Sequence, residues 1–287
     1  MTKNNPSTKK TKTKSGHEKH RERLRSRRRI THREAVKAAA RLRTDEHGKR
    51  YVIRFSLSER VEHILLMISF TVLGMTGLMQ RYAGTAVGDF LLSMIGGIEI
   101  TRQLHHIFAL MFFLEAIYHF GAFIYGLFVY KRWGKIWPTF DDFRHFWEMM
   151  LLNLGISKKH PNFGRFTFEE KIEYWALIWG VLVMGITGVM QWFPVFTTQW
   201  LPGSTIPVAR ALHSLEAVLA VLAILIWHLY HTLIKTINKS IFTGVMTEEE
   251  MLKEHPTELK YLKQAAAALD RQKQQNQIEE EKNMDVE

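Results

Sequence analysis

The chain has 287 residues, no cysteine and a formal net charge of +11. Without cysteine it cannot hold a covalently attached c-type haem, a cysteine-ligated iron–sulfur cluster, a disulfide or a thiol nucleophile. The positive charge is concentrated at the start, because residues 1–60 carry 20 Lys and Arg against 6 Asp and Glu. The apolar runs that follow indicate one membrane domain with polar tails rather than two soluble domains.

Residues 1–50 are rich in Lys, Arg, Ser and Thr. This composition is typical of a solvated, mostly disordered tail. Nucleic acid is not an expected partner, because no aromatic residue is interleaved with the basic ones before Tyr51. A strongly basic segment beside a first membrane span instead keeps the N-terminus in the cytoplasm.

Four apolar segments are long enough to cross a bilayer at about 1.5 Å per helical residue. Within a membrane domain of residues 51–240, we expect spans at about residues 61–81, 101–130, 173–193 and 207–235. Four spans place both termini on one side. That side is the cytoplasm, because the 131–171 loop has eight Lys and Arg and the 82–100 loop has none. Residues 241–287 then form a polar, partly helical cytoplasmic tail.

The histidines inside the spans carry the strongest functional signal, because polar groups are costly within a membrane. His213 and His228 lie fifteen residues apart in the fourth span. On a helix this separation puts both imidazoles on roughly the same side, about 22 Å apart along the axis. One imidazole near each membrane surface predicts two haem groups stacked across the bilayer. Each iron then needs a second axial histidine from another span.

An internal repeat supplies partners for these histidines. The pieces ERVEH (59–63) and LGMTGLMQ (73–80) are matched, at one constant offset, by EKIEY (170–174) and MGITGVMQ (184–191). RQLH, which ends at His105, likewise matches RALH, which ends at His213. The pattern indicates a duplicated two-helix hairpin with its axis along the membrane normal. It predicts that His105 and His213 lie at the same depth and ligate the outer haem.

The inner haem has two candidate partners for His228. The repeat places His119 at nearly the depth of His228, whereas His63 lies just inside the cytoplasmic end of the first span. If both bound haem, there would be three haems, and His231 would be the candidate for the additional ligand.

Taken together, these motifs resemble the prokaryotic di-haem cytochrome b family, which includes gamma subunits of membrane formate dehydrogenases and cytochrome subunits of nickel–iron hydrogenases. The resemblance covers about residues 50–262. It rests on the histidine near the start of the first span, the LH pair of the second and the H-x14-H spacing of the fourth. EKIEYWALIWGVLVMGITG and EEEMLKEHPTEL look similar to the menaquinone-linked branches. The family implies an all-α integral membrane protein, a four-helix bundle that binds b-type haem.

The resemblance also implies roles for individual residues. His105 and His213 would ligate the outer haem, and His63 and His228 the inner one, which favours His63 over His119. A menaquinone site would adjoin the inner haem. The expected partner is a periplasmic redox subunit, either a multihaem c-type cytochrome or an iron–sulfur protein. This chain departs from the pattern by adding His119 and by lacking an asparagine in GRFTFEEK before the third span, so the quinone contacts are less defined than the haem ligands.

The predicted function is electron transfer between menaquinone and that partner, in the bacterial cytoplasmic membrane and without a complete catalytic cycle of its own. Two other classes are open. A proton- or metal-translocating transporter would also use intramembrane groups such as Glu115 and Glu216, but it does not explain paired histidines at two depths. A stand-alone transmembrane reductase would need a loop that reads its substrate, and the outer loops are short.

Overall fold

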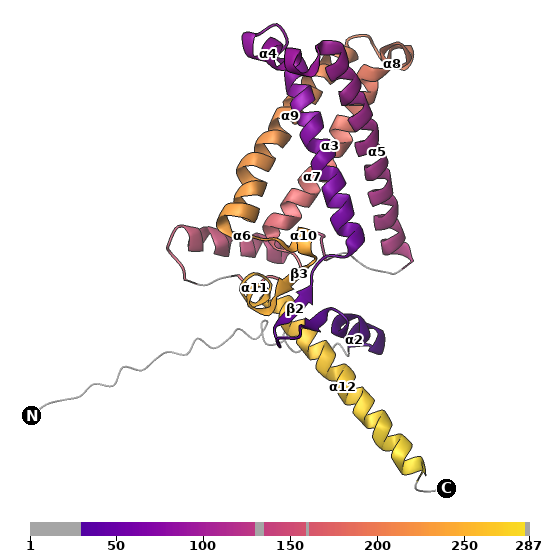
Figure 1. The fold of residues 1–287 in the computed structure, drawn as a ribbon, viewed down its shortest axis with the longest axis vertical. Coiled ribbons are helices and arrows are strands. Elements are labelled where there is room, and N and C mark those ends of the chain that lie inside the picture. The colour runs from indigo at the N-terminus through magenta and orange to yellow at the C-terminus, as the bar shows by residue number, and fades with distance from the viewer. Residues whose placement is uncertain (1–29, 130–134, 159–160, 285–287) are drawn as a thin grey trace, which may run out of the picture. The chain divides into compact units, whose positions relative to one another are not determined.

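The computed structural model describes residues 30–129, 135–158 and 161–284, and its contacts divide them into two units (Figure 1). The larger unit runs from Arg41 to Lys260 and contains every long apolar helix described. The smaller unit consists of residues 30–40 and 261–284.

The larger unit is built on four helices that are long and apolar enough to cross a membrane. They are α3 (Leu57–Arg81), α5 (Ile98–Phe128), α7 (Phe168–Trp192) and α9 (Thr205–Leu222), which continues through the π-helical segments η1 (Ala223–His228) and η2 (Tyr230–Lys235). The predicted bundle of four long apolar helices is therefore confirmed. Large apolar side chains are exposed all along these helices, as expected of surfaces that face lipid.

The helix starts show why the first and third spans resemble each other. Ser56 and Thr167, at equivalent positions of the two repeats, are both N-caps whose hydroxyl oxygens accept the backbone N–H three residues on. In return, the carboxylates of Glu59 and Glu170 accept from the backbone N–H of the two caps. This reciprocal capping box fixes both helix starts. It also explains why the third span begins at Phe168, five residues before the predicted residue 173.

The helices pack as two hairpins. α3 packs mainly against α5, and α7 mainly against α9, while α3 also contacts α9. Short helices join the members of each hairpin at one end of the bundle, α4 (Ala86–Ile95) in the first and α8 (Pro194–Trp200) in the second (Figure 1). The duplicated hairpin seen in the sequence is thus present in the packing.

The opposite end of the bundle carries a small antiparallel sheet. Its strands are β1 (Leu42–Thr44), β2 (Arg50–Ile53) and β3 (Val245–Thr247), in the order β1-β2-β3. Val52 pairs with Met246, and both are buried. The helices near this end are α6 (Phe140–Asn153), α10 (Ser240–Thr243), α11 (Glu248–Glu254) and the start of α12 (Pro256–Met284). Segments from before α3 and after α9 therefore form one structure.

The structure departs from the predicted disorder of residues 1–50. In the smaller unit, α2 (His32–Ala39) begins with a capping box at Thr31, and its Ala35 and Ala38 are buried. His32 Nδ1 lies 3.0 Å from Gln272 Oε1 of α12. In the larger unit, β1 and β2 find a partner in β3, which composition alone does not reveal. Residues 1–29 lie outside the described residues.

Candidate functional site

Two histidines from the two hairpins face each other near the end that carries α4 and α8. The ring centroids of His105 (α5) and His213 (α9) are 6.4 Å apart. The Nδ1 atom of His105 lies 2.9 Å from Thr76 Oγ1, and that of His213 lies 2.9 Å from Thr187 Oγ1. Each threonine hydroxyl also donates to the carbonyl four residues earlier in its helix. Its oxygen is therefore left to accept from Nδ1–H, so each Nε2 keeps a free lone pair.

The residue after each threonine is a glycine that leaves room for the imidazole. A Cβ at Gly77 would lie 3.4 Å from His105 Cε1, and a Cβ at Gly188 would lie 3.4 Å from His213 Cε1. These contacts are at the tight end of ordinary van der Waals packing. Any side chain larger than alanine would push the ring out of place.

A second histidine pair lies toward the end that carries the sheet. The ring centroids of His63 (α3) and His228 (η1) are 6.3 Å apart. His228 Nδ1 lies 2.8 Å from Glu173 Oε2, so a carboxylate takes the place that threonine has in the other pair. His63 Nδ1 is buried without a hydrogen-bond partner among the described residues. The two pairs thus share a spacing and differ in what supports the rings.

The spacing of both pairs suits a metal atom between the rings. A metal–imidazole bond is about 2.0 Å long, and the ring centre lies about 1 Å behind the nitrogen, so two imidazoles that held one metal between them would have ring centroids about 6 Å apart. Rings in direct contact would be closer, and hydrogen-bonded rings would need one nitrogen to donate to the other. The four histidines of the two pairs therefore fit two metal-containing groups, each held by two histidines.

His119 is held differently from the four paired histidines. Its Nδ1 lies 2.9 Å from Glu62 Oε2, and its Nε2 lies 3.1 Å from the Tyr174 hydroxyl. The ring that faces it is that of Tyr174, at 5.9 Å. His231, proposed as a ligand for a third haem, bonds through Nδ1 to the Trp227 carbonyl, 2.8 Å away. Neither histidine offers a paired imidazole in the part of the chain that is described.

The sequence pattern of the prokaryotic cytochrome b561 family matches residues 54–244, which contain all five of these intramembrane histidines and His231. The chain belongs to this family. It is therefore a multi-pass membrane cytochrome of the haem b class that takes part in electron transport. The predicted family and the predicted four-helix fold are both confirmed.

Two similar proteins are cytochrome b556 subunits of formate dehydrogenases from Escherichia coli (strain K12). The Fdo subunit is 25% identical over 209 residues, which cover 71% of this chain and 90% of the relative. The nitrate-inducible Fdn subunit is 21% identical over 217 residues, which cover 75% and 94%. A Shigella flexneri Fdn subunit matches to the same extent.

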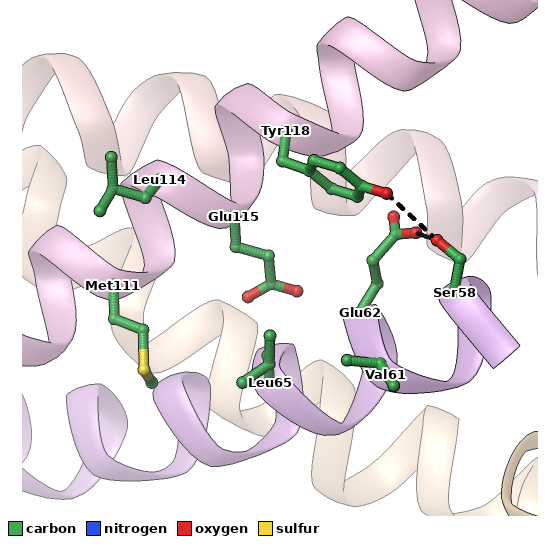
Figure 2. A pocket seen from close by; sticks show the side chains of 8 residues that line it. All are labelled: Ser58, Val61, Glu62, Leu65, Met111, Leu114, Glu115 and Tyr118. Atoms are coloured by element: carbon green, nitrogen blue, oxygen red, sulfur yellow. Dashed lines mark hydrogen bonds between the residues drawn. The ribbon is translucent and has the colours of Figure 1, made fainter.

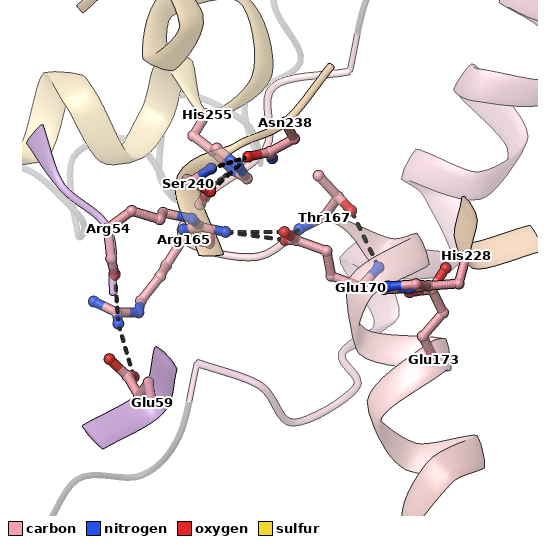
Figure 3. Close-up of polar contacts among 11 residues, drawn as sticks. Arg54, Glu59, Arg165, Thr167, Glu170, Glu173, His228, Asn238, Ser240 and His255 are labelled. Atoms are coloured by element: carbon pink, nitrogen blue, oxygen red, sulfur yellow. Dashed lines mark hydrogen bonds and ion pairs between the residues drawn. The ribbon is translucent and has the colours of Figure 1, made fainter. Parts of the chain in front are cut away.

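At the sheet end, ion pairs join the two repeats of the cytochrome (Figure 3). Arg54, which is buried, pairs with Glu170 at 3.1 Å and donates to the backbone carbonyl of Arg165. Arg165 pairs with Glu59 at 3.5 Å and donates to the Arg54 carbonyl at 3.4 Å. The two arginines occupy equivalent positions of the repeats, and so do the two glutamates. Each repeat therefore supplies the arginine for the capping-box glutamate of the other.

This cluster perturbs the groups around it. Burial, with the nearby Arg41 and Arg54 charges, holds the pKa of Arg165 below its ordinary value. Burial, with the charge of Arg54, lowers the pKa of His255 to about 4. The His255 Nδ1 atom bonds to the Gly164 carbonyl at 2.8 Å, and its Nε2 atom has no partner within the described ranges. The neutral imidazole is thus part of the folded end of the bundle.

Sequence reasoning missed the side chains that support the histidines of the cytochrome. Thr76 and Thr187 lie within the repeated LGMTGLMQ and MGITGVMQ motifs, and Glu62 and Glu173 lie within ERVEH and EKIEY. The sequence signal that could have identified these side chains is that the same polar residue occurs in both copies of the repeat, within an otherwise apolar span. A polar residue retained twice in that setting needs a partner.

Proposed function

We propose that this cytochrome carries electrons between menaquinone and a redox partner subunit through two haem b groups. His105 and His213 hold one group, and His63 and His228 hold the other. The observation that carries the proposal is the matched spacing of the two pairs, 6.4 and 6.3 Å between ring centroids, toward opposite ends of one bundle. Bound haem supplies an iron that gains and loses one electron, and the chain supplies ligation, burial and hydrogen bonds to the ligands.

The supporting side chains give the two pairs different electronic settings. Thr76 and Thr187 hold the rings of the outer pair with neutral hydroxyl oxygens. Glu173 holds His228 with a carboxylate, which would make the imidazole a more basic ligand and favour the ferric state of a haem held there. Haems held at the two sites would therefore have different reduction potentials.

The contacts of His119 support two haems rather than three. Both of its ring nitrogens are within hydrogen-bond distance of protein groups, so ligation would first require breaking the contact with Tyr174. His63 has no such contact on its buried Nδ1 atom and faces His228. We therefore assign the inner haem to His63 and His228.

The distribution of charge supports an orientation in the membrane, and the relatives support a kind of partner. The strands of the sheet come directly before the first span and soon after the fourth, and the residues between the second and third spans are basic, so we place the sheet end in the cytoplasm of a bacterial cell. The α4 and α8 end then faces the periplasm and a redox subunit, either a multihaem c-type cytochrome or an iron–sulfur protein. The relatives named above are formate dehydrogenase subunits, which supports a place in a complex of that kind. We place the exchange of electrons with quinone at the inner pair, His63 and His228, rather than at the outer pair.

Purified full-length protein, expressed in a haem-supplying host, tests the proposal. A pyridine haemochrome spectrum should give two b-type haems per chain, and acid–acetone should extract both, because there is no cysteine to form a thioether link. Protein that folds in the membrane without this spectrum would end the proposal. One haem or three would overturn the assignment of the two pairs.

A further inference from the structure

The helix α6, between the second and third spans, carries an exposed row of large apolar side chains. The row consists of Phe140, Phe143, Trp147 and Leu154, which are 100%, 74%, 51% and 65% exposed. At about 100° per helical residue, these four positions lie within about 60° of one another around the helix. We call this row the apolar face of α6. A contiguous exposed apolar surface of this kind marks a site of interaction with another protein or with a membrane.

The other two sides of α6 are accounted for within the chain. Met149, on the side away from the apolar face, is buried against Phe163 and Phe168. The ring of Phe146 also meets that of Phe168, with centroids 5.6 Å apart. The charged residues of the helix share a third side, which holds Asp141, Arg144 and Glu148. A helix with separate polar and apolar sides is typical of segments that lie in the plane of a membrane surface.

The start of α6 is fixed to the first turns of α7. The Asp142 carboxylate accepts from the Lys171 ammonium through both oxygens, at 2.8 Å. The same carboxylate accepts from the backbone N–H of Thr139 at 2.6 Å, and so also closes the first turn of α6. Just before the helix, the carbonyl of Ile136 accepts from the Trp175 indole N–H at 3.2 Å. The position of α6 is therefore set by the part of α7 that begins the third span.

The apolar surface of the bundle reaches this same level in both hairpins. Ile172, next to Lys171 in α7, is exposed and is the repeat equivalent of Val61 in α3. Val61 belongs to a recess of about 430 Å³ between α3 and α5 (Figure 2). The apolar walls of this recess are formed by Val61, Leu65, Met111 and Leu114. The surface that faces lipid thus extends to the first turns of α3 and α7, and α6 is attached at its edge.

We propose that α6 lies in the membrane surface at the sheet end of the bundle, with its apolar face inserted among phospholipid acyl chains just beneath the head groups. In Figure 1 the helix runs across this end, whereas the four spans run along the bundle. The occupant is lipid because the apolar face continues the exposed apolar surface of α7 at Ile172. Phe and Trp are well suited to the boundary between acyl chains and head groups.

Charge supports the same occupant. Residues 131–171 hold eight Lys and Arg against five Asp and Glu, and this surplus is attracted to anionic head groups. Inserted in this way, α6 anchors the start of α7 at a fixed depth, because interfacial aromatic and basic residues set the depth and tilt of the spans to which they are joined. The inference requires neither bound haem nor a particular orientation of the protein.

Spin labels test the proposal directly, because the chain has no cysteine and each variant then carries one label. The full-length protein is placed in nanodiscs of phosphatidylethanolamine and phosphatidylglycerol. Phe143→Cys and Trp147→Cys report on the apolar face, and Arg144→Cys is the matched control on the polar side of the same helix. Leu110→Cys, exposed in the middle of α5, is the reference for lipid, and Ile278→Cys, exposed in the polar α12, is the reference for water.

The measurement is the collision rate of each label with oxygen, which dissolves in lipid, and with a nickel chelate, which stays in water. The oxygen-to-nickel ratio at positions 143 and 147 should be close to that at 110 and several-fold above those at 144 and 278. A ratio at 143 and 147 equal to that at 278 would place the apolar face in water. Shielding from both reagents would mean that protein covers it, and a short distance between labels on two chains would identify a second copy. Each of these results would overturn the proposal.

A photoactivatable phospholipid extends the test to the unmodified chain. The probe carries a diazirine on the acyl chain next to the head group, and the labelled peptides are mapped by mass spectrometry. Labels should appear on residues 140–154 as well as on the spans. Phe143→Asp combined with Trp147→Asp should reduce the labelling of α6 several-fold and leave that of α5 unchanged, because a carboxylate is costly among acyl chains. Labels confined to the four spans of the wild-type protein would also overturn the proposal.

Discussion

Tyr174 occupies the position in α7 that His63 occupies in α3, and each faces a histidine that a glutamate supports. One difference between the repeats thus separates a pair of facing imidazoles from a single imidazole whose two ring nitrogens both contact protein groups. The two sites should therefore respond differently when their histidines are removed.

His63→Ala should remove one haem per chain, and His119→Ala should remove none. His63 faces His228 with a ring spacing that suits axial ligation, whereas both ring nitrogens of His119 are engaged by protein groups. The measurements are haem stoichiometry and the low-spin resonance signals of the oxidised protein. Loss of a haem in His119→Ala, with two retained in His63→Ala, would reverse the assignment of the inner ligands.

Thr76→Val and Thr187→Val should weaken haem binding at the outer pair by about 10- to 100-fold, the range seen when a hydrogen-bond partner of a metal ligand is removed. Valine keeps the shape of threonine but cannot accept from the histidine Nδ1–H. Transfer of haem to apomyoglobin measures the loss. Thr71→Val is the matched control, because Thr71 makes the same bond to its own helix, 2.7 Å to the Met67 carbonyl, and supports no histidine. Equal haem retention in all three variants would contradict the role of the threonines.

Glu173→Gln should raise the reduction potential of the inner haem. The carboxylate beside His228 stabilises ferric iron, and glutamine keeps the hydrogen-bonding shape without the charge. A tenfold change in the one-electron equilibrium corresponds to about 59 mV, and we expect a shift of that order in a redox titration. Glu62→Gln, at the same position in the other repeat, should leave both potentials within experimental error. A lowered or unchanged potential in Glu173→Gln would count against ligation by His228.

Lowering the pH from 6.5 to 4 should destabilise the sheet end of the bundle. Burial lowers the pKa of His255 to about 4, below its ordinary value of 6.5, so the unfolded chain binds more protons in this window. The contribution of His255 to the free energy of unfolding is therefore full above pH 6.5. It falls as the pH decreases toward 4, by on the order of 3 kcal/mol. Thermal unfolding should lose part of this pH dependence in His255→Gln and keep it in His47→Gln, since His47 is exposed. An unchanged pH profile in His255→Gln would exclude His255 as its source.

A reporter at the C-terminus should be active only as a cytoplasmic fusion. The basic stretches of the sequence come before the first span and between the second and third spans, and positive charge is retained on the cytoplasmic side. Fluorescent protein and alkaline phosphatase fusions give opposite signals and check each other. Phosphatase activity at the C-terminus would invert the orientation and exchange the inner and outer haem assignments.

The spans and the meeting of His105 with His213 were accessible from the sequence, because hydropathy and a constant internal offset are local properties. The sheet could not be predicted, because β2 lies before the first span in the sequence and pairs with β3, which follows the fourth span. The choice between His63 and His119 stayed open because His228 lies one residue late in the repeat. The π-helical segment η1, which ends at His228, accounts for this shift, since a π-turn accommodates one extra residue.

The ion pairs that join the two repeats constrain the order in which the protein can fold. During synthesis the first hairpin enters the membrane with Arg54 already present, but Glu170 is not translated until the second hairpin follows. Until then Arg54 lacks the carboxylate that pairs with it in the finished protein, and burying it would leave an uncompensated charge, which is strongly destabilising. The sheet end can therefore close over Arg54 only after both hairpins have been made.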